Sequence, residues 1–546
     1  MRKVETEVLV IGGGAIGAGV ARDLAMRGLK TVLVERSDWA SGTTGRYNGL
    51  LHSGSRYALR DITVARECIQ ENTILRKIMP GCIEDTGGYV VATPWDDPTL
   101  GDYLIECCNQ AGIPIEEVSV GHVLHEEPHI HPDIRRALRV PDAAADSFLA
   151  TRATVHSAQE YGAYTWNYHP VAKILKRNER VIGAECLDLC TGEEVKISAH
   201  LVINAAGAWV GEIGDLAGIK IPLVCSKGSM IATAYRVVDT VITRLRWPSD
   251  CDSVLPSHSV SVLGCTDVIV NSPNALSADA EEIQRIRQEC TKLVPITRDL
   301  RWLRTWTGVR ALYPTTPASG ATAAGLSRTH VIVDHEVADG VPGLISIIGG
   351  KWTTHRLIAE QVVDLVCHKL NVVRPCRTHL EPLPGMSKCH YHRRSTPLVH
   401  IETKGMGSDL VCECEMVTRT EIEKTLADED IRNLDDLRRA TRLGMGPCQG
   451  SFCSYRAAGT YHWLRSQSDR DVTAHLLAFL QERWRGVRPV ASGHQVHQMR
   501  LNEMIYRNLL GAEQLTRVQG NDEVRSLANV RGMIQPRSAL TYGTRR

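Results

Sequence analysis

The segment Val8–Glu35 constrains the fold more than any other part of the chain. It reads VLVIGGGAIGAGVARDLAMRGLKTVLVE: an apolar strand, a turn containing Gly12, Gly14 and Gly17, a helix, and a second strand that ends in Glu35. Glycines at this spacing allow a tight turn and bring the N–H groups of a helix N-terminus close to a pyrophosphate. An acid after the second strand is placed to bind ribose hydroxyls. The segment therefore predicts an α/β, Rossmann-like dinucleotide-binding domain.

The bulk composition describes an ordinary folded protein with room for several domains. The chain has 546 residues, a net charge of +1 and 43% hydrophobic residues, which gives no sign of a nucleic-acid surface. No apolar run approaches the roughly 20 residues that a membrane-spanning helix needs. The apolar N-terminal segment is interrupted by glycines and does not resemble a signal peptide. We therefore expect a cytoplasmic chain whose membrane contact, if any, is made through a partner.

Three further segments have the character of ligand-binding loops. Residues 41–57 are rich in glycine and hydroxyl side chains and too irregular for a helix or strand. A strand over 196–204 ends in Ala-Ala-Gly, which fits either close packing or close approach to a ligand. A strand over 343–348 meets the glycines of a second strand-to-helix junction, which lacks GxGxxG spacing. One dinucleotide fold is therefore expected, holding either a redox partner of the substrate or a permanently bound flavin.

Hydrophobic periodicity predicts the other elements only coarsely. We expect helices over 63–78, 100–112, 148–166 and 471–484, strands over 88–93, 169–176 and 180–187, and a strand-rich section over about 220–330. Thr418 and Glu421 form a TxxE capping box, and Asn433 is placed to cap a second helix.

Four of the 17 cysteines are arranged as metal ligands. Cys412 and Cys414 form a CxC pair, and Cys448 and Cys453 a CxxxxC pair flanked by glycines. Structural zinc favours pairs two residues apart, and glycines can turn backbone N–H groups toward cluster sulfur atoms. This spacing favours a [2Fe–2S] cluster, with zinc and unliganded thiols as alternatives. The other cysteines are scattered and are expected to be small buried residues.

In combination, these motifs resemble a known family. IGGGAIGAGVARDLAMRGL, GLLHSGSRYA, NAAG, WTGVRALYP, IIGGKWTTHR, VCECE and RLGMGPCQGSFC occur in the order found in catalytic A subunits of anaerobic glycerol-3-phosphate dehydrogenase. The resemblance covers nearly the whole chain. It implies an FAD-dependent oxidoreductase domain over 1–372 with an inserted strand-rich α+β substrate part. A linker over 373–408, a small helical BFD-like [2Fe–2S] domain over 409–460 and a helical tail over 461–546 with a disordered end would follow.

The resemblance also assigns site residues. It places FAD against Gly12, Gly14, Gly17, Glu35, Ser41, Thr44, His52, Ser53, Val171, Ala206, Gly207, Gly350 and Thr353. It places the substrate against Arg56, Tyr57, Arg310, Lys351 and, as a further candidate, Arg328. His52 is the expected base, although it could instead hydrogen-bond flavin or backbone. Arg310 would bind phosphate, while Lys351 would stabilise an alkoxide or the reduced flavin, or cap its loop.

The implied reaction is oxidation of sn-glycerol 3-phosphate to dihydroxyacetone phosphate. Electrons would pass through the cluster to partners, namely a second flavoprotein subunit together with a membrane-bound iron–sulfur subunit feeding quinone, with the chain at the inner face of the membrane. The alternatives are a flavin dehydrogenase for another polyol phosphate or a hydroxy acid, and a non-catalytic electron-transfer or redox-sensing subunit. Tyr47-Asn48, Ala311 and Trp352 depart from the family pattern and leave the identity of the polyol phosphate open.

Overall fold

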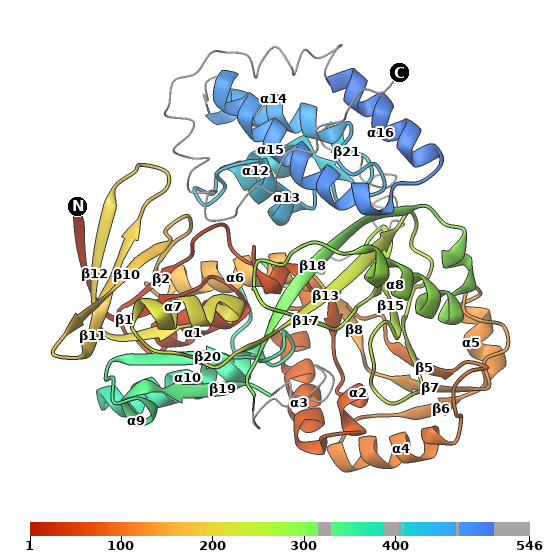
Figure 1. Cartoon of the computed structure of the whole chain (residues 1–546), viewed down its shortest axis with the longest axis horizontal. Coiled ribbons are helices and arrows are strands. Elements are labelled where there is room, and N and C mark those ends of the chain that lie inside the picture. The colour runs from red at the N-terminus through yellow and green to blue at the C-terminus, as the bar shows by residue number, and fades with distance from the viewer. Residues whose placement is uncertain (315–328, 387–402, 404, 406–408, 466–468, 507–546) are drawn as a thin grey trace.

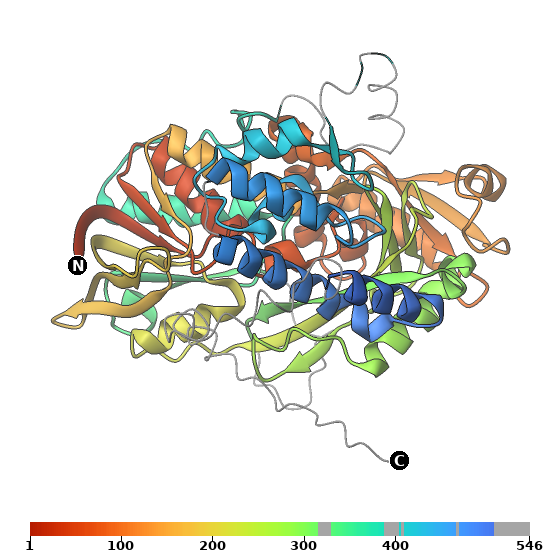
Figure 2. The ribbon, with the colours of Figure 1, turned by 90° about the horizontal axis from the view of Figure 1, so that it is seen from above.

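The computed structural model describes residues 1–314, 329–386, 403, 405, 409–465 and 469–506 (Figure 1). One part is built on an eight-stranded sheet, a second on a nine-stranded sheet, and a helical C-terminal part lies across both. Figure 2 shows the C-terminal helices running over the two sheet-containing parts. The fold is therefore the predicted α/β arrangement followed by a small helical domain.

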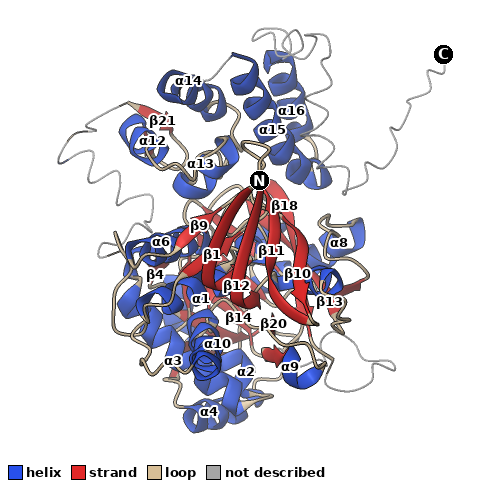
Figure 3. Ribbon diagram, turned by 90° about the vertical axis from the view of Figure 1, so that its left-hand side faces the viewer, coloured by secondary structure: helices blue, strands red, loops and turns tan. Residues whose placement is uncertain are grey.

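The eight-stranded sheet contains the predicted dinucleotide-binding unit. Its central strands β12 (Glu194–Asn204), β1 (Arg2–Ile11), β2 (Thr31–Val34) and β9 (Tyr164–Trp166) are parallel neighbours, and β20 (Leu344–Ile348) is parallel to the end of β12. The antiparallel strands β10 (Val171–Arg177), β11 (Arg180–Leu187) and β19 (Val331–Asp334) complete it. Figure 3 shows this sheet edge-on with helices beside it. The carboxyl ends of β1, β2, β12 and β20 thus lie at one edge, where open α/β sheets bind ligands.

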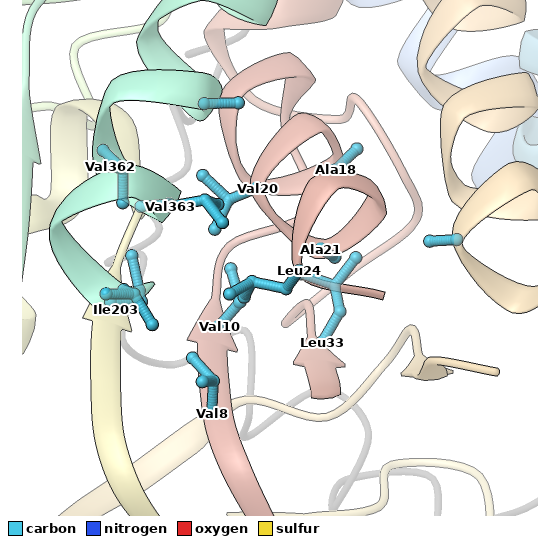
Figure 4. Close-up of a cluster of buried hydrophobic side chains, with 14 of the residues drawn as sticks. Val8, Val10, Ala18, Val20, Ala21, Leu24, Leu33, Ile203, Val362 and Val363 are labelled. Carbon is cyan, nitrogen blue, oxygen red and sulfur yellow. The ribbon is translucent and has the colours of Figure 1, made fainter. Parts of the chain in front are cut away.

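Three helices cover one face of this sheet. They are α1 (Ala15–Met26), α6 (Ser147–Glu160) and α10 (His355–Leu370). Val10 and Leu24 are fully buried and pack with Val363 of α10 (Figure 4). Burying side chains of this size is worth about 1.5–3 kcal/mol each, so this core fixes the helix N-termini relative to the strand ends.

The nine-stranded sheet is the strand-rich part expected from the sequence. Its main order is β17 (Val268–Val270), β13 (Val224–Thr233), β16 (Val260–Gly264), β15 (Ser253–Ser257), β14 (Val241–Arg244), β5 (Gly88–Ala92), β7 (Arg136–Val140) and β6 (Glu116–Val118). The long strand β18 (Trp302–Leu312) pairs antiparallel with β13 along its length. Helices α3 (Ile62–Ile78), α4 (Leu100–Ala111), α5 (Val120–Glu126) and α8 (Ala280–Leu293) surround it.

Two expectations from the sequence need correction. The helix predicted over 148–166 ends at Glu160, because Gly162 has φ +92° and the chain then turns into β9 beside β2. The first part of the predicted linker is packed, since Leu383 and Met386 are buried against the end of α3. The remaining linker residues 387–402 and the tail beyond 506 lie outside the described residues.

The C-terminal domain is a compact set of helices around a short hairpin. The hairpin β21 (Leu410–Cys412) and β22 (Val417–Thr418) leads into α12 (Arg419–Leu426) and α13 (Leu434–Thr441), followed by α14 (Cys453–Arg465), α15 (Asp469–Val487) and α16 (His494–Met504). Thr418 Oγ1 accepts the Glu421 N–H, and Asn433 Oδ1 accepts two N–H groups of α13. Both predicted N-caps are confirmed.

A buried ion network docks this domain on the dinucleotide-binding part. Arg439 of α13 contacts Asp38 at 2.5 Å and Asp436 at 2.7 Å, and both carboxylates are inaccessible to solvent. Burial and the Asp38 charge raise the pKa of Asp436, which also accepts the Tyr168 hydroxyl at 2.7 Å. Trp39 Nε1 donates to the Asp430 carboxylate at 2.9 Å. The loop after β2 is therefore the docking platform for the helical domain.

Replacing Arg439 tests this docking. Asp38 keeps its contact with Arg152 at 3.3 Å, but Arg439→Met leaves the buried Asp436 with no ion-pair partner among the described residues. The free energy of unfolding is therefore expected to fall by about 3–5 kcal/mol. The control is Arg419→Met, whose pair with Glu423 lies on the surface and contributes about 0–1 kcal/mol. Chemical denaturation measures both variants. Equal, small effects would contradict a docking role for Arg439.

Candidate functional site

The turn after β1 has the geometry of a dinucleotide cradle. Gly12 has φ +114°, and a Cβ there would lie 2.5 Å from the Ala205 carbonyl oxygen. Gly14 is the N-cap of α1, and a Cβ at Gly17 would lie 1.8 Å from the Gly12 oxygen. Side chains at these positions would fill the space between the strand ends and the helix, so the residues fit a closely approaching pyrophosphate.

Glu35 connects the end of β2 to this turn. Its carboxylate accepts the Gly13 N–H at 2.7 Å and the Ser37 N–H at 3.0 Å. Burial raises the pKa of the Glu35 carboxyl, and these two N–H bonds oppose the shift. Ala15 N–H donates to Thr44 Oγ1 at 3.1 Å, which joins the loop to the helix N-terminus.

The cradle opens into one large cavity of about 2190 Å³. Most of the predicted cofactor residues line it, from five separate segments of the chain: Gly12, Gly14, Glu35, Ser41, Thr44, His52, Val171, Ala206, Gly207, Gly350 and Thr353. Gly17 and Ser53 do not line it. Gly17 packs beneath the turn, and Ser53 is fully buried with its N–H donated to Asp142 Oδ1 at 2.6 Å.

A second wall of the cavity carries the predicted catalytic groups. The His52 ring meets the Tyr57 ring edge-on at 5.1 Å between centroids, and Lys351 Nζ lies 4.8 Å from the Tyr57 ring centroid. The backbone N–H of His52 donates to Thr353 Oγ1 at 3.1 Å, and its backbone carbonyl accepts a hydrogen bond from the Asn72 side-chain amide at 3.0 Å. The glycine-rich loop and the second strand-to-helix junction are thus held together, with an imidazole and an ammonium group on the same wall.

The two predicted phosphate-binding arginines also line the cavity. Arg56 pairs with Asp252 at 2.8 Å and also donates to the Ser249 carbonyl. Arg310 of β18 donates through Nη1 to Ser226 Oγ at 3.0 Å and lies 3.4 Å from Asp267 Oδ1. Its Nη2 donates to Cys265 Sγ at 2.8 Å and to the Thr266 carbonyl at 3.3 Å. These contacts orient each guanidinium group, and an anion would share its N–H donors with them. Arg328 lies outside the described residues.

Two of the residues that depart from the family pattern contact each other. The rings of Tyr47 and Trp352 stack with centroids 5.8 Å apart at an interplanar angle of 23°, and both line the cavity. The Trp352 ring also lies 5.5 Å from the His355 ring. The substitutions therefore build one aromatic wall next to Lys351.

The four predicted metal-binding cysteines come together in the C-terminal domain. Side-chain contacts join Cys412 to Cys453, Cys453 to Cys448 and Cys448 to Cys414. The Gly444 N–H points at the Cys412 sulfur and the Gly450 N–H at the Cys448 sulfur.

Cys412 and Cys453 are buried, whereas Cys414 and Cys448 are partly exposed. Four convergent thiols with backbone N–H donors fit an iron–sulfur cluster.

Comparison with known proteins agrees with this geometry. Residues 7–356 match the family model "FAD dependent oxidoreductase", and residues 410–459 match "BFD-like [2Fe-2S] binding domain". The A subunit of anaerobic glycerol-3-phosphate dehydrogenase from Escherichia coli K12 is 38% identical over 532 residues, covering 93% of this chain and 97% of the relative. The chain belongs to the family of anaerobic glycerol-3-phosphate dehydrogenase A subunits.

Other members of this family and solved structures extend the comparison. The A1 subunit of the Haloferax volcanii enzyme is 38% identical, with 92% of this chain and 90% of the relative covered. The FAD complex of glycerol-3-phosphate dehydrogenase from Bacillus halodurans has a TM-score of 0.56 at 20% identity, covering 97% of this chain and 95% of that one. The cofactors of the chain are FAD in the first part and a [2Fe–2S] cluster in the C-terminal domain.

Sequence reasoning missed how the flavin part and the C-terminal domain share the cavity. Ile431, Arg432 and Asn433 of the [2Fe–2S] domain line the same cavity as Glu35 and Val171. No spacing rule connects residues about 400 positions apart, so no sequence signal pointed to this contact. In the described part of the chain, no helix is long and apolar enough to span a bilayer.

Proposed function

We propose that this chain oxidises sn-glycerol 3-phosphate to dihydroxyacetone phosphate and passes the electrons through its cluster to a partner. The observation that carries the proposal is the cavity wall on which His52, Lys351 and Arg310 are placed beside the FAD cradle. Relatives that span almost the full chain are named as A subunits of anaerobic glycerol-3-phosphate dehydrogenase. The names of these relatives and the chemistry of the three side chains support the same reaction.

The wall supplies a base for the substrate hydroxyl. An imidazole can accept a proton near neutral pH, and His52 has its backbone fixed on both sides by Thr353 and Asn72. The imidazole of His52 contacts the Tyr57 ring edge-on, and Lys351 Nζ lies over the face of the Tyr57 ring. Lys351 thereby places a positive charge where negative charge develops as the hydroxyl proton leaves.

The arginines supply the phosphate site. A dianion in a partly enclosed cavity needs more than one cation, and the guanidinium fork binds two oxygens at once. Ion pairs with Asp252 and Asp267 hold the side chains of Arg56 and Arg310 in place. These contacts favour a phosphate-bearing alcohol over a hydroxy acid as substrate.

The bound cofactors supply the redox chemistry: FAD accepts two electrons as a hydride equivalent, and the cluster transfers electrons singly. The docked [2Fe–2S] domain also lines the FAD cavity, through Asn433 and Arg439. Within one chain this arrangement converts a two-electron oxidation into a one-electron output.

The electron acceptor belongs to the partners. The relatives are named as subunits, which supports a complex of several subunits. We infer that the partners are a second flavoprotein subunit and a membrane-bound iron–sulfur subunit that reduces quinone. The chain would then lie at the cytoplasmic face of the membrane, held there by its partners.

The alternative substrate is another polyol phosphate, and the cavity wall disfavours the larger ones. The stacked Tyr47 and Trp352 rings occupy a wall of the cavity next to Lys351, and this bulk favours a short carbon chain over a branched or cyclic one. Steady-state assay with a small panel of polyol phosphates and an artificial electron acceptor separates the two substrates.

The base can be tested by substitution. His52→Ala is expected to lower kcat by about 10²–10⁴-fold, because proton removal loses its acceptor, while FAD content stays at one per chain. His122→Ala, on the exposed face of α5, is the control and should turn over normally. An unchanged kcat in His52→Ala would remove His52 as the base.

The cluster ligands can be tested separately from the flavin site. Cys448→Ser is expected to abolish the visible absorption of the cluster and electron delivery to a one-electron acceptor, because one of four thiolates is lost. Reduction of FAD by substrate should persist in single-turnover experiments. Cys190→Ser, an exposed cysteine of the first part, serves as control. Loss of FAD reduction in Cys448→Ser would contradict two independent redox modules.

A further inference from the structure

Five arginines lie together where the C-terminal helices meet β18. Arg304 is on β18, Arg46 is within the glycine-rich loop over 41–57, Arg438 is on α13, and Arg483 and Arg485 are on α15. All five line the large cavity, and Figure 1 shows α13 and α15 above β18. We call the space between these five side chains the interdomain chamber. Gly486 permits the close approach, since a Cβ there would lie 2.8 Å from Arg304 Nε.

The chamber contains more positive than negative charge. Arg438 is paired with Asp435 at 2.8 Å, and Arg485 with Glu482 at 2.8 Å. The other three arginines of the chamber form no ion pair with any residue in the described part of the chain. Asp435 and Glu482 also act on these three arginines through space, so five guanidinium groups share two carboxylates and positive charge remains in excess.

Several of these guanidinium N–H groups are buried with no acceptor. Arg304 Nε and Nη1 and Arg483 Nε are inaccessible to solvent and have no hydrogen-bond acceptor among the described residues. Burial and the charge of Arg438 lower the pKa of Arg304 to about 10, and burial lowers that of Arg46 to about 10. Both stay protonated at neutral pH. A buried, unpaired cation costs several kcal/mol, so the chamber requires an anion.

Among the described residues, the groups that form the dinucleotide cradle make no hydrogen bond to the chamber arginines. The cradle is formed by the glycine turn, Glu35 and Thr44, and none of the five arginines hydrogen-bonds to these groups in the described structure. Arg46 Nε instead donates to the Ser41 carbonyl at 3.1 Å. The other four arginines lie on β18, α13 and α15, which are not part of the dinucleotide unit.

We propose that the interdomain chamber is a second anion site, which binds a small oxyanion of charge −2, either inorganic phosphate or a phosphomonoester, while FAD is bound. Guanidinium forks at Arg304, Arg483 and Arg46 match the oxygens of such a group bidentately. Arg483 is held for this role by its Nη2, which donates to Gln449 Oε1 at 2.6 Å. Because the forks come from both domains, the anion bridges the flavin part and the [2Fe–2S] domain.

Isothermal titration of the protein loaded with FAD and cluster, with inorganic phosphate as the probe, tests the site. The wild type is expected to bind phosphate at two sites, the chamber and the substrate site at Arg310. Arg304→Met is expected to weaken the chamber site at least tenfold, and Arg483→Met likewise if the first variant folds poorly. Arg304→Lys, which keeps the charge but loses the fork, is expected to be intermediate.

The titration separates this proposal from the proposed function. If Arg310→Met removes all phosphate binding, the chamber binds none and the proposal is wrong. If Arg310→Met removes none while Arg304→Met removes all, the chamber proposal stands and the substrate-phosphate assignment fails.

Thermal unfolding distinguishes a ligand site from a structural role. Phosphate is expected to raise the wild-type midpoint and to leave that of Arg304→Met unchanged. In phosphate-free buffer Arg304→Met should unfold at or above the wild-type temperature, because a buried unpaired charge is gone. Arg500→Met is the control, because Arg500 forms an exposed pair with Glu503. Phosphate should raise its unfolding midpoint as it does that of the wild type.

Glycerol 2-phosphate is the second probe, and a rise with it extends the site to phosphomonoesters. If neither probe raises the wild-type midpoint, or if Arg304→Met is destabilised in phosphate-free buffer and still responds to phosphate, the proposal is overturned.

Discussion

The buried contact between Arg439 and the two carboxylates of Asp38 and Asp436 holds the two redox domains in one arrangement. Asp38 follows the dinucleotide unit directly, so the platform that receives the [2Fe–2S] domain is part of the loop that borders the FAD cavity. An uncompensated charge at this depth would cost several kcal/mol. Loss of either partner would therefore be costly, and the contact fixes which face of the helical domain meets the flavin part.

Everything at the site depends on strand ends that are held at one edge of a sheet. The core of β1, α1 and α10 sets the glycine turn and the second strand-to-helix junction opposite each other. Thr353 then bonds to the His52 backbone, and β18 carries Arg310 from the neighbouring sheet. The proposed base, the proposed phosphate-binding arginine and the cradle come from different elements, and the packed core brings them to one cavity.

The sequence predicted the parts of this arrangement that local rules govern. The glycine turn, Glu35 and the capping residues Thr418 and Asn433 follow from backbone geometry and hydrogen bonding within a few residues. The four cysteines were recognisable because ligand spacing is also local. The contacts of Arg439 and the interdomain chamber were not predictable, since they join residues hundreds of positions apart whose charges look like ordinary surface residues. The prediction of a helix extending to residue 166 was wrong, because a tertiary contact, the pairing of β9 with β2, outweighs helical periodicity there.

We propose that one chain takes an electron pair from an alcohol at FAD and passes the electrons one at a time to its own cluster. An anaerobic absorption spectrum of the protein loaded with FAD and cluster, before and after sn-glycerol 3-phosphate, tests this route. We expect the flavin band to bleach and the cluster absorption to fall in the same protein, without any partner. Flavin that keeps its oxidised spectrum at saturating substrate would rule this route out.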